Sequence, residues 1–137
     1  MSSWRQTASL VVAGIAGISI IVFAVVFVFS TLRPQSPQIT STSVPGVSFV
    51  VDPPTLRVCD PPTIAKVSWN AANASIERVD IFVLGENARE KLFLAWRESV
   101  GSANTEAWVG PGTVFVLRDN DSKKQLAKFS VGSQSCN

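Results

Sequence analysis

The chain contains no histidine and no tyrosine, and only 16% of its 137 residues are charged, whereas 46% are hydrophobic. Without histidine it offers no imidazole base, no histidine metal ligand and no axial histidine for haem or chlorophyll. The scarcity of charge excludes a disordered chain, a coiled coil and a basic nucleic-acid-binding arm. The two cysteines form no C-x-x-C motif, which argues against a cysteine metal site. We therefore expect no cofactor and no nucleic-acid partner.

The sequence also lacks the motifs of an enzyme. The segment GENARE at 85–90 has neither the glycines nor the lysine of a phosphate-binding loop. The composition permits a Ser–Lys dyad, but no pattern marks one. We therefore expect a non-catalytic protein.

What the sequence does contain is one long uncharged apolar run, from Ala8 to Phe29. As a helix, these 22 residues would extend about 33 Å, enough to cross a bilayer core. A cleaved signal peptide is the alternative, but it would have a shorter apolar core and a small-x-small cleavage site, and none follows Phe29. Trp4 stands where an interfacial membrane anchor is expected. The predicted organisation is a tail at 1–7, a transmembrane helix at 8–32, a Pro/Ser/Thr linker at 33–46 and a globular domain at 47–137.

The orientation in the membrane depends on weaker signals. Arg5 and Arg33 flank the apolar run, so the positive-inside count is nearly balanced. Both cysteines lie in the globular domain, and paired cysteines belong to oxidising compartments. We therefore expect a single-pass protein of the inner (plasma) membrane, with a cytoplasmic N-terminus and a periplasmic or extracellular C-terminal domain.

Small residues recur every four positions in the first half of the expected helix, at Ser9, Ala13 and Gly17. Such a row lets the backbone of a second helix approach closely in lipid. The functional interpretation is a helix-packing face for other integral membrane subunits, with membrane lipid around the rest. The alternative is an ordinary anchor, because glycine and alanine are common in membrane spans.

From Val47 onward the pattern changes to short runs in which apolar and polar residues alternate, separated by turn residues such as those at 110–112 and 119–123. Short strands at about ten-residue spacing are typical of an all-β sandwich. The predicted strands are 47–51, 55–59, 64–69, 78–84, 91–96, 105–109, 113–118 and 125–131.

Several segments of this domain carry a resemblance: PPTLRVCDPPTIAKVSWNA at 53–71, IERVDIFV at 76–83, TEAWVGPGTVFVLRD at 105–119 and LAKFSV at 126–131. They resemble bacterial immunoglobulin-like and fibronectin type III-like domains. The resemblance implies an Ig-like β-sandwich of seven to eight strands, with Trp69 closing the second strand. The chain departs from antibody domains, because it lacks their inter-sheet cysteine pair and corner tyrosine.

The Ig-like resemblance also bears on the cysteines. In such a sandwich the second half of the first strand runs parallel to the last strand, so their C-terminal ends share one end of the domain. This implies a disulfide between Cys59 and Cys136, which are 77 residues apart. Two free thiols or a two-ligand metal site are the alternatives, and the absence of histidine argues against the metal.

Five aromatic residues are candidates for contacts with a partner: Phe82, Phe93, Trp96, Trp108 and Phe115. The two tryptophans fall at the ends of predicted strands, and the three phenylalanines alternate opposite the expected core positions. Tryptophan and phenylalanine are enriched at the centres of interfaces. The alternative is that both sheets are simply rich in aromatic residues.

Three functions fit these features. The first is a non-catalytic accessory subunit of a larger membrane complex, for example a respiratory or photosynthetic assembly, in which this chain ligates no chlorophyll or haem through histidine. The second is a membrane-anchored module that binds glycan, cell wall or protein. The third is an assembly factor of a pilus or secretion apparatus. The small-residue row and the lack of a catalytic site favour the first.

Overall fold

The computed structural model describes residues 39–136. The expected tail, the expected span and the residues Trp4, Ser9, Ala13 and Gly17 lie outside the described residues. Within 39–136, no helix has both the length and the apolar character needed to cross a bilayer.

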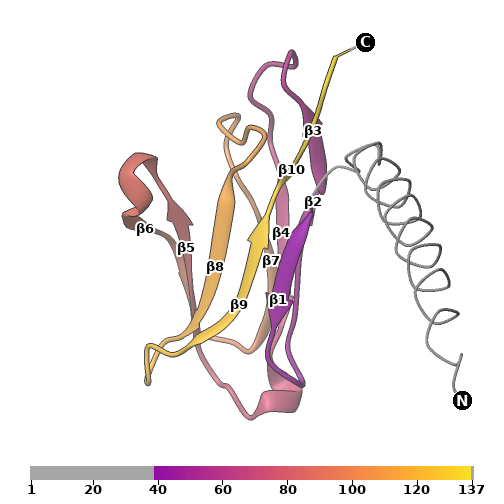
Figure 1. Cartoon of the computed structure of the whole chain (residues 1–137). Coiled ribbons are helices and arrows are strands. Elements are labelled where there is room, and N and C mark those ends of the chain that lie inside the picture. The colour runs from indigo at the N-terminus through magenta and orange to yellow at the C-terminus, as the bar shows by residue number, and fades with distance from the viewer. Residues whose placement is uncertain (1–38, 137) are drawn as a thin grey trace, which may run out of the picture. The chain divides into compact units, whose positions relative to one another are not determined.

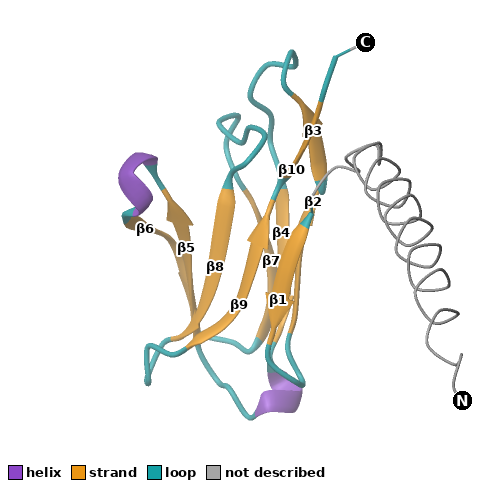
Figure 2. Cartoon of the chain, viewed as in Figure 1, coloured by secondary structure: helices purple, strands orange, loops and turns teal. Residues whose placement is uncertain are grey.

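Residues 39–136 form an all-β domain of ten strands with two short 3₁₀ turns (Figures 1 and 2). The predicted all-β class is confirmed. The elements are β1 (Thr40–Ser43), β2 (Ser48–Asp52), β3 (Thr55–Arg57), β4 (Lys66–Asn70), η1 (Ala72–Ala74), β5 (Val79–Leu84), η2 (Glu86–Ala88), β6 (Glu90–Trp96), β7 (Val100–Asn104), β8 (Val114–Asp119), β9 (Gln125–Ser130) and β10 (Gly132–Gln134).

The described strands form a five-stranded sheet in the order β1-β9-β8-β5-β6, a three-stranded sheet in the order β2-β4-β7, and a two-stranded pair. The pair joins β3, which follows β2, to β10, which follows β9, and it is parallel. The other strand pairs are antiparallel. The parallel pairing of the first and last strand regions follows the expectation, and the whole arrangement is consistent with an Ig-like β-sandwich.

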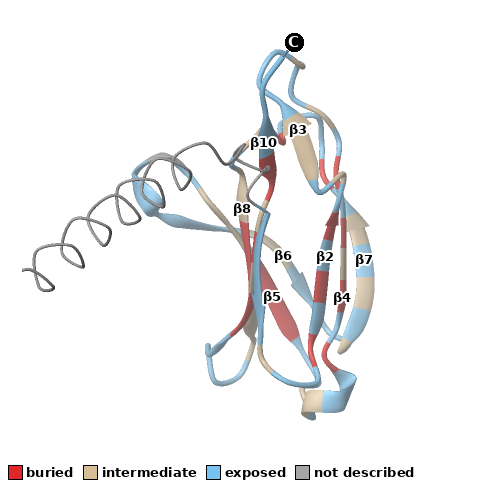
Figure 3. Cartoon of the chain, turned by 45° about the vertical axis from the view of Figure 1, so that its right-hand side comes forward, coloured by how far each residue is buried: buried red, intermediate tan, exposed pale blue. Residues whose placement is uncertain are grey.

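The hydrophobic core lies between the two larger sheets, and alternation along the strands produces it. In β4, Val67 and Trp69 are buried while Lys66 and Asn70 are exposed, because successive side chains of a strand point to opposite faces. Ile81 and Phe115 of the five-stranded sheet belong to the same buried cluster. Figure 3 shows buried segments on β2, β5 and β8. The predicted core position of Trp69 is confirmed, since the residue is 2% exposed.

Several segments differ from expectation, and the described residues form ten strands instead of the seven to eight that the Ig-like resemblance implies. The predicted strand at 105–109 is wrong, because Val109 makes only an isolated bridge to Thr63, and β7 lies just before this segment. The sequence of β7, VGSAN, is small and polar, and its strand conformation depends on pairing with β4 rather than on its own pattern. Residues 40–43, expected within the linker, form β1, which pairs with β9. All four side chains are polar and exposed, so the sequence shows no apolar alternation there.

Candidate binding groove and disulfide-bonded end

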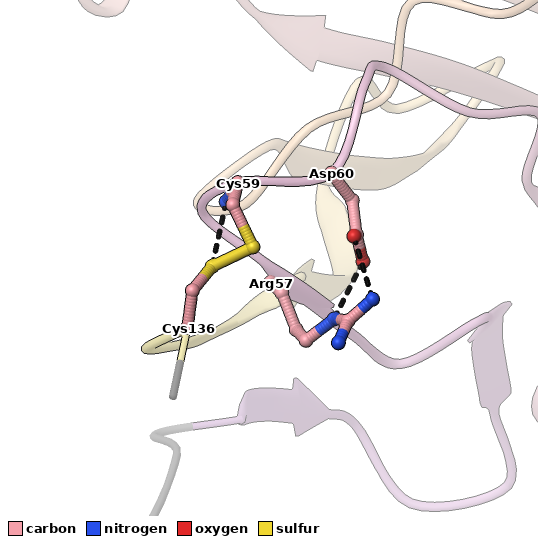
Figure 4. The surroundings of a disulfide bond; sticks show 4 residues. All are labelled: Arg57, Cys59, Asp60 and Cys136. Carbon is pink, nitrogen blue, oxygen red and sulfur yellow. Dashed lines mark hydrogen bonds and ion pairs between the residues drawn. A yellow bond between two sulfur atoms is a disulfide. The ribbon is translucent and has the colours of Figure 1, made fainter.

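A disulfide joins Cys59 and Cys136, as predicted, with 6.1 Å between the two Cα atoms (Figure 4). The parallel strands β3 and β10 bring the cysteines together, because each strand runs toward the bond. The backbone N–H of Val58 donates to the carbonyl of Gln134 at 2.9 Å, and the N–H of Cys59 donates to Cys136 Sγ at 3.0 Å. The bond therefore ties the C-terminal segment to the body of the domain.

An ion pair accompanies the disulfide. Arg57 Nε donates to Asp60 Oδ2 at 3.0 Å, and Arg57 Nη2 donates to Asp60 Oδ1 at 2.9 Å (Figure 4). The guanidinium hydrogen bonds lower the pKa of Asp60, and the same contacts raise the pKa of Arg57. The side chains are 58% and 35% exposed, so solvent screens the attraction and the pair adds little stability.

Three aromatic side chains from different elements meet beside β5. Phe93 lies on β6, Trp108 in the connection between β7 and β8, and Phe115 on β8. The ring centroids are 5.9 Å apart for Phe93 and Trp108, 6.2 Å for Phe93 and Phe115, and 6.0 Å for Trp108 and Phe115. These separations are typical of favourable aromatic contacts.

A β-bulge places Phe93 in this cluster. Ile81 pairs with Leu94 and Phe82 pairs with Leu92, so Phe93 is the extra residue of β6. Bulges redirect a side chain without ending the strand. Strict alternation along 91–96 therefore assigns Phe93 to the wrong face.

A groove of about 320 Å³ lies next to the aromatic cluster. Its lining is mostly apolar, and Trp108 remains 39% exposed there. In Figure 3 the β5–β6 hairpin turns away from β2, β4 and β7. The residues lining the groove are Val83, Gly85, Lys91, Leu92, Phe93 and Trp108.

The hairpin above the groove has an uncommon backbone. Asn87 and Ala88 have positive φ values of 70° and 55°, and the N–H of Gly85 donates to the carbonyl of Arg89 at 2.9 Å. Asparagine tolerates this region well, whereas alanine pays a steric penalty there. The tight turn fixes the spacing between Gly85 and Lys91, which both line the groove.

The five candidate aromatic residues thus have four different environments. Phe93 and Trp108 line the groove, as a contact role requires. Phe115 is fully buried, so the expectation that it faces away from the core is wrong for this residue. Trp96 packs edge-on against Trp69, with 5.7 Å between ring centroids. Trp69 lies on β4, the central strand of the three-stranded sheet, so Trp96 connects the edge strand β6 of the larger sheet to the middle of the smaller one.

Phe82 lies on the opposite, outer face of the five-stranded sheet, because its neighbour Ile81 points into the core. On that face an ion pair joins Glu90 of β6 to Arg118 of β8, with 2.6 Å between Arg118 Nη2 and Glu90 Oε1. In the strand register, Glu90 lies opposite the residue two positions after Phe82, and Arg118 lies opposite the residue two positions before it. The ion pair therefore spans the sheet at Phe82 and leaves that residue only partly exposed.

One polar side chain is buried although no signal in the sequence marks it. Asp80 is 4% exposed, and it accepts hydrogen bonds from Asn120 Nδ2 at 2.9 Å and from Lys123 Nζ at 3.1 Å. Both partners lie in the turn between β8 and β9, forty and more residues away. Alternation along β5 places Asp80 on the solvent face, and no local signal shows that a distant turn covers it. The charged residues Lys123 and Asp80 therefore serve the structure at this end of the domain.

The described residues show no cluster of side chains that could hold a metal ion. Within 39–136 no three potential metal-ligating side chains of the His, Cys, Asp and Glu types gather in one place. The groove lining offers apolar surface and one lysine amine. Such a surface can hold an apolar group and attract a carboxylate beside it.

Comparison with known proteins adds no family. No protein-family model matches the chain. No curated protein and no solved structure matches it either.

Proposed function

We propose that the chain is a non-catalytic accessory subunit of a larger membrane protein complex. One transmembrane helix at 8–32 anchors it, and an Ig-like domain stands on the extracytoplasmic side. The observation that carries the proposal is the groove beside β6, where Phe93 and the exposed Trp108 meet Lys91. The uncharged run from Ala8 to Phe29 supports the anchor.

The composition of the groove favours a protein partner. A partner that covers the exposed Trp108 side chain buries its apolar surface away from water, and buried aromatic side chains supply much of the affinity of an interface. Lys91 at the groove adds a charge that selects a partner with a carboxylate nearby. Within the membrane, Ser9, Ala13 and Gly17 would form the second contact, against a helix of the same complex.

A second candidate is a membrane-anchored ligand-binding module. The exposed indole of Trp108 favours it, because an aromatic ring at the mouth of a shallow groove suits the apolar face of a sugar. In that case the isolated domain would bind glycan without the anchor.

The test is purification of the tagged full-length chain in mild detergent, followed by mass spectrometry of the proteins that accompany it. Trp108→Glu places a charge in the groove, and Val50→Glu is the control on β2. Both positions are exposed, at 39% and 54%. We expect Trp108→Glu to remove the partners and Val50→Glu to keep them.

The helix contact is tested separately. Ala13→Leu with Gly17→Leu keeps the span apolar, so insertion should be unchanged, but the larger side chains hold another helix away. We expect fewer copurifying partners at equal membrane levels. An unchanged set of partners for both the groove variant and the helix variant would exclude the accessory-subunit function.

A further inference from the structure

The end of the domain that carries the disulfide is unusually apolar. Val58 and Ile64 are 63% and 57% exposed, the highest values among the exposed large hydrophobic side chains of the described residues. Pro61 and Pro62, which lie between them, are also exposed. The bridge between Thr63 and Val109 holds Ile64 at this end.

One ion pair, Arg57–Asp60, lies beside the disulfide, whereas two ion pairs lie at the opposite end of the domain. Arg57 and Asp60, beside the disulfide, neutralise each other through two hydrogen bonds (Figure 4). At the other end, the turn between β8 and β9 joins β5 through the ion pairs Arg78–Asp121 and Lys123–Asp80. The two ends of the domain therefore differ in polarity.

The first described residue lies toward the end of the domain that carries the disulfide. Strand β1 runs antiparallel to β9, and its first residue, Thr40, pairs with Ser130 just before β10 begins. Ile39 lies against Gly132, where an added Cβ would meet its Cγ1 at 3.2 Å. From Gly132, β10 runs with β3 toward the disulfide. Ile39 therefore lies at the start of the strand that leads to the disulfide.

The remaining connection is short. Nine residues, 30–38, separate the apolar run at 8–29 from Ile39. Even fully extended they reach about 30 Å. A tether of this length keeps the domain at high local concentration near the bilayer, so weak contacts suffice to orient it.

We propose that the disulfide-bonded end of the domain faces the bilayer and rests on the lipid headgroup region through Val58, Ile64 and the neighbouring prolines. The inference rests on the proposed function in one respect, namely that residues 8–29 span the membrane. Apolar side chains at loop ends partition into the interface, and the pairing of Arg57 with Asp60 reduces the cost of bringing their charges close to lipid. The groove at β6 then lies within reach of a partner's membrane-proximal surface.

The test uses the full-length chain in phosphatidylcholine vesicles that contain nitroxide-labelled lipid. Single cysteines at Ile64 (I64C) and Pro62 (P62C) carry a fluorophore, and cysteines at Val50 (V50C) and Val100 (V100C) are the controls. The controls, at 54% and 47% exposure, lie on β2 and β7 away from the disulfide. The native disulfide, verified by non-reducing mass mapping, serves as the folding control for each variant.

We expect the lipid nitroxide to quench the fluorophore at Ile64 and Pro62 at least two-fold more than at the control positions. Equal quenching at all four positions, or stronger quenching at Val50 or Val100, would overturn the inference. Flotation of the vesicles separates this result from the proposed function, because a chain that does not float with lipid has no membrane anchor. The purified vesicles contain no partner protein. An unquenched fluorophore at Ile64 would therefore also overturn the inference, and it would leave a partner protein as the occupant of this end.

Discussion

The contact between Trp69, Trp96 and Gly101 gives the sharpest test of the packing. Gly101 of β7 pairs with Trp69 of β4, and Trp96 reaches the same place from β6. A Cβ at Gly101 would lie 2.6 Å from Trp69 Cζ2 and 3.0 Å from Trp96 Nε1. Both distances are shorter than ordinary carbon contacts, so Gly101→Ala forces one of the indoles to move.

The magnitude of this effect follows from two opposing terms. Alanine restricts the unfolded chain more than glycine does, which stabilises the native state by about 0.4–1 kcal/mol where the backbone is compatible. Overpacking a core costs about 1–3 kcal/mol, and Trp69, at 2% exposure, has no free space to enter. Trp96, at 37% exposure, can swing outward, but it then loses its edge-on contact. We expect a net loss of about 1–2 kcal/mol.

The assay is urea unfolding of residues 37–137, which form a compact unit of their own, followed by far-ultraviolet circular dichroism. A loss of this size lowers the urea midpoint by about 1 M for a domain of this size. Gly110→Ala is the matched control, because no described atom lies within 4 Å of its added Cβ. If Gly101→Ala proved as stable as Gly110→Ala, the two tryptophans would not pack rigidly against β7, and the reasoning would fail.

Three further predictions concern the covalent and polar contacts. Replacing Cys59 and Cys136 together by serine should lower the free energy of unfolding by about 4 kcal/mol, since the bond closes a long loop; a loss under about 1 kcal/mol in urea titration would contradict this. Asp80→Ala should cost about 1–3 kcal/mol by the same assay, because it leaves buried hydrogen-bond donors without an acceptor, and an unchanged midpoint would argue against a buried network. The Ser122 hydroxyl, with the backbone N–H groups of the turn, lowers the pKa of Asp119 below its ordinary 3.8, so its stabilising contribution is present above that pH and is lost as the pH falls below it. Asp119→Asn should therefore flatten the decrease in stability below about pH 4 in acid titration, and an unchanged slope would assign that decrease to other carboxylates.

Much of the fold was predictable because its signals are local. Alternation at 64–69 and 125–131 identified strands and their buried faces, and Ala65, Val67 and Ala127 are indeed buried. The side chain of every second strand residue meets the same environment, so a period of two survives whatever strand lies alongside. The disulfide was predictable only through the Ig-like resemblance, since the spacing of two cysteines does not itself pair them.

The tertiary structure alone decided which residues share a surface. The bulge that turns Phe93 toward Trp108 depends on how β6 pairs with β5, and the burial of Phe115 depends on what faces β8 from across the core. Asp80 is buried because a turn forty residues later covers it. The Trp96 indole packs closely against a glycine of the other sheet. The sequence by itself determined the all-β class, the main strands and the apolar run at 8–29. Strand pairing, register and the contacts between sheets join residues far apart in the chain, so no local pattern encodes them, and the groove and the apolar end became visible only in three dimensions.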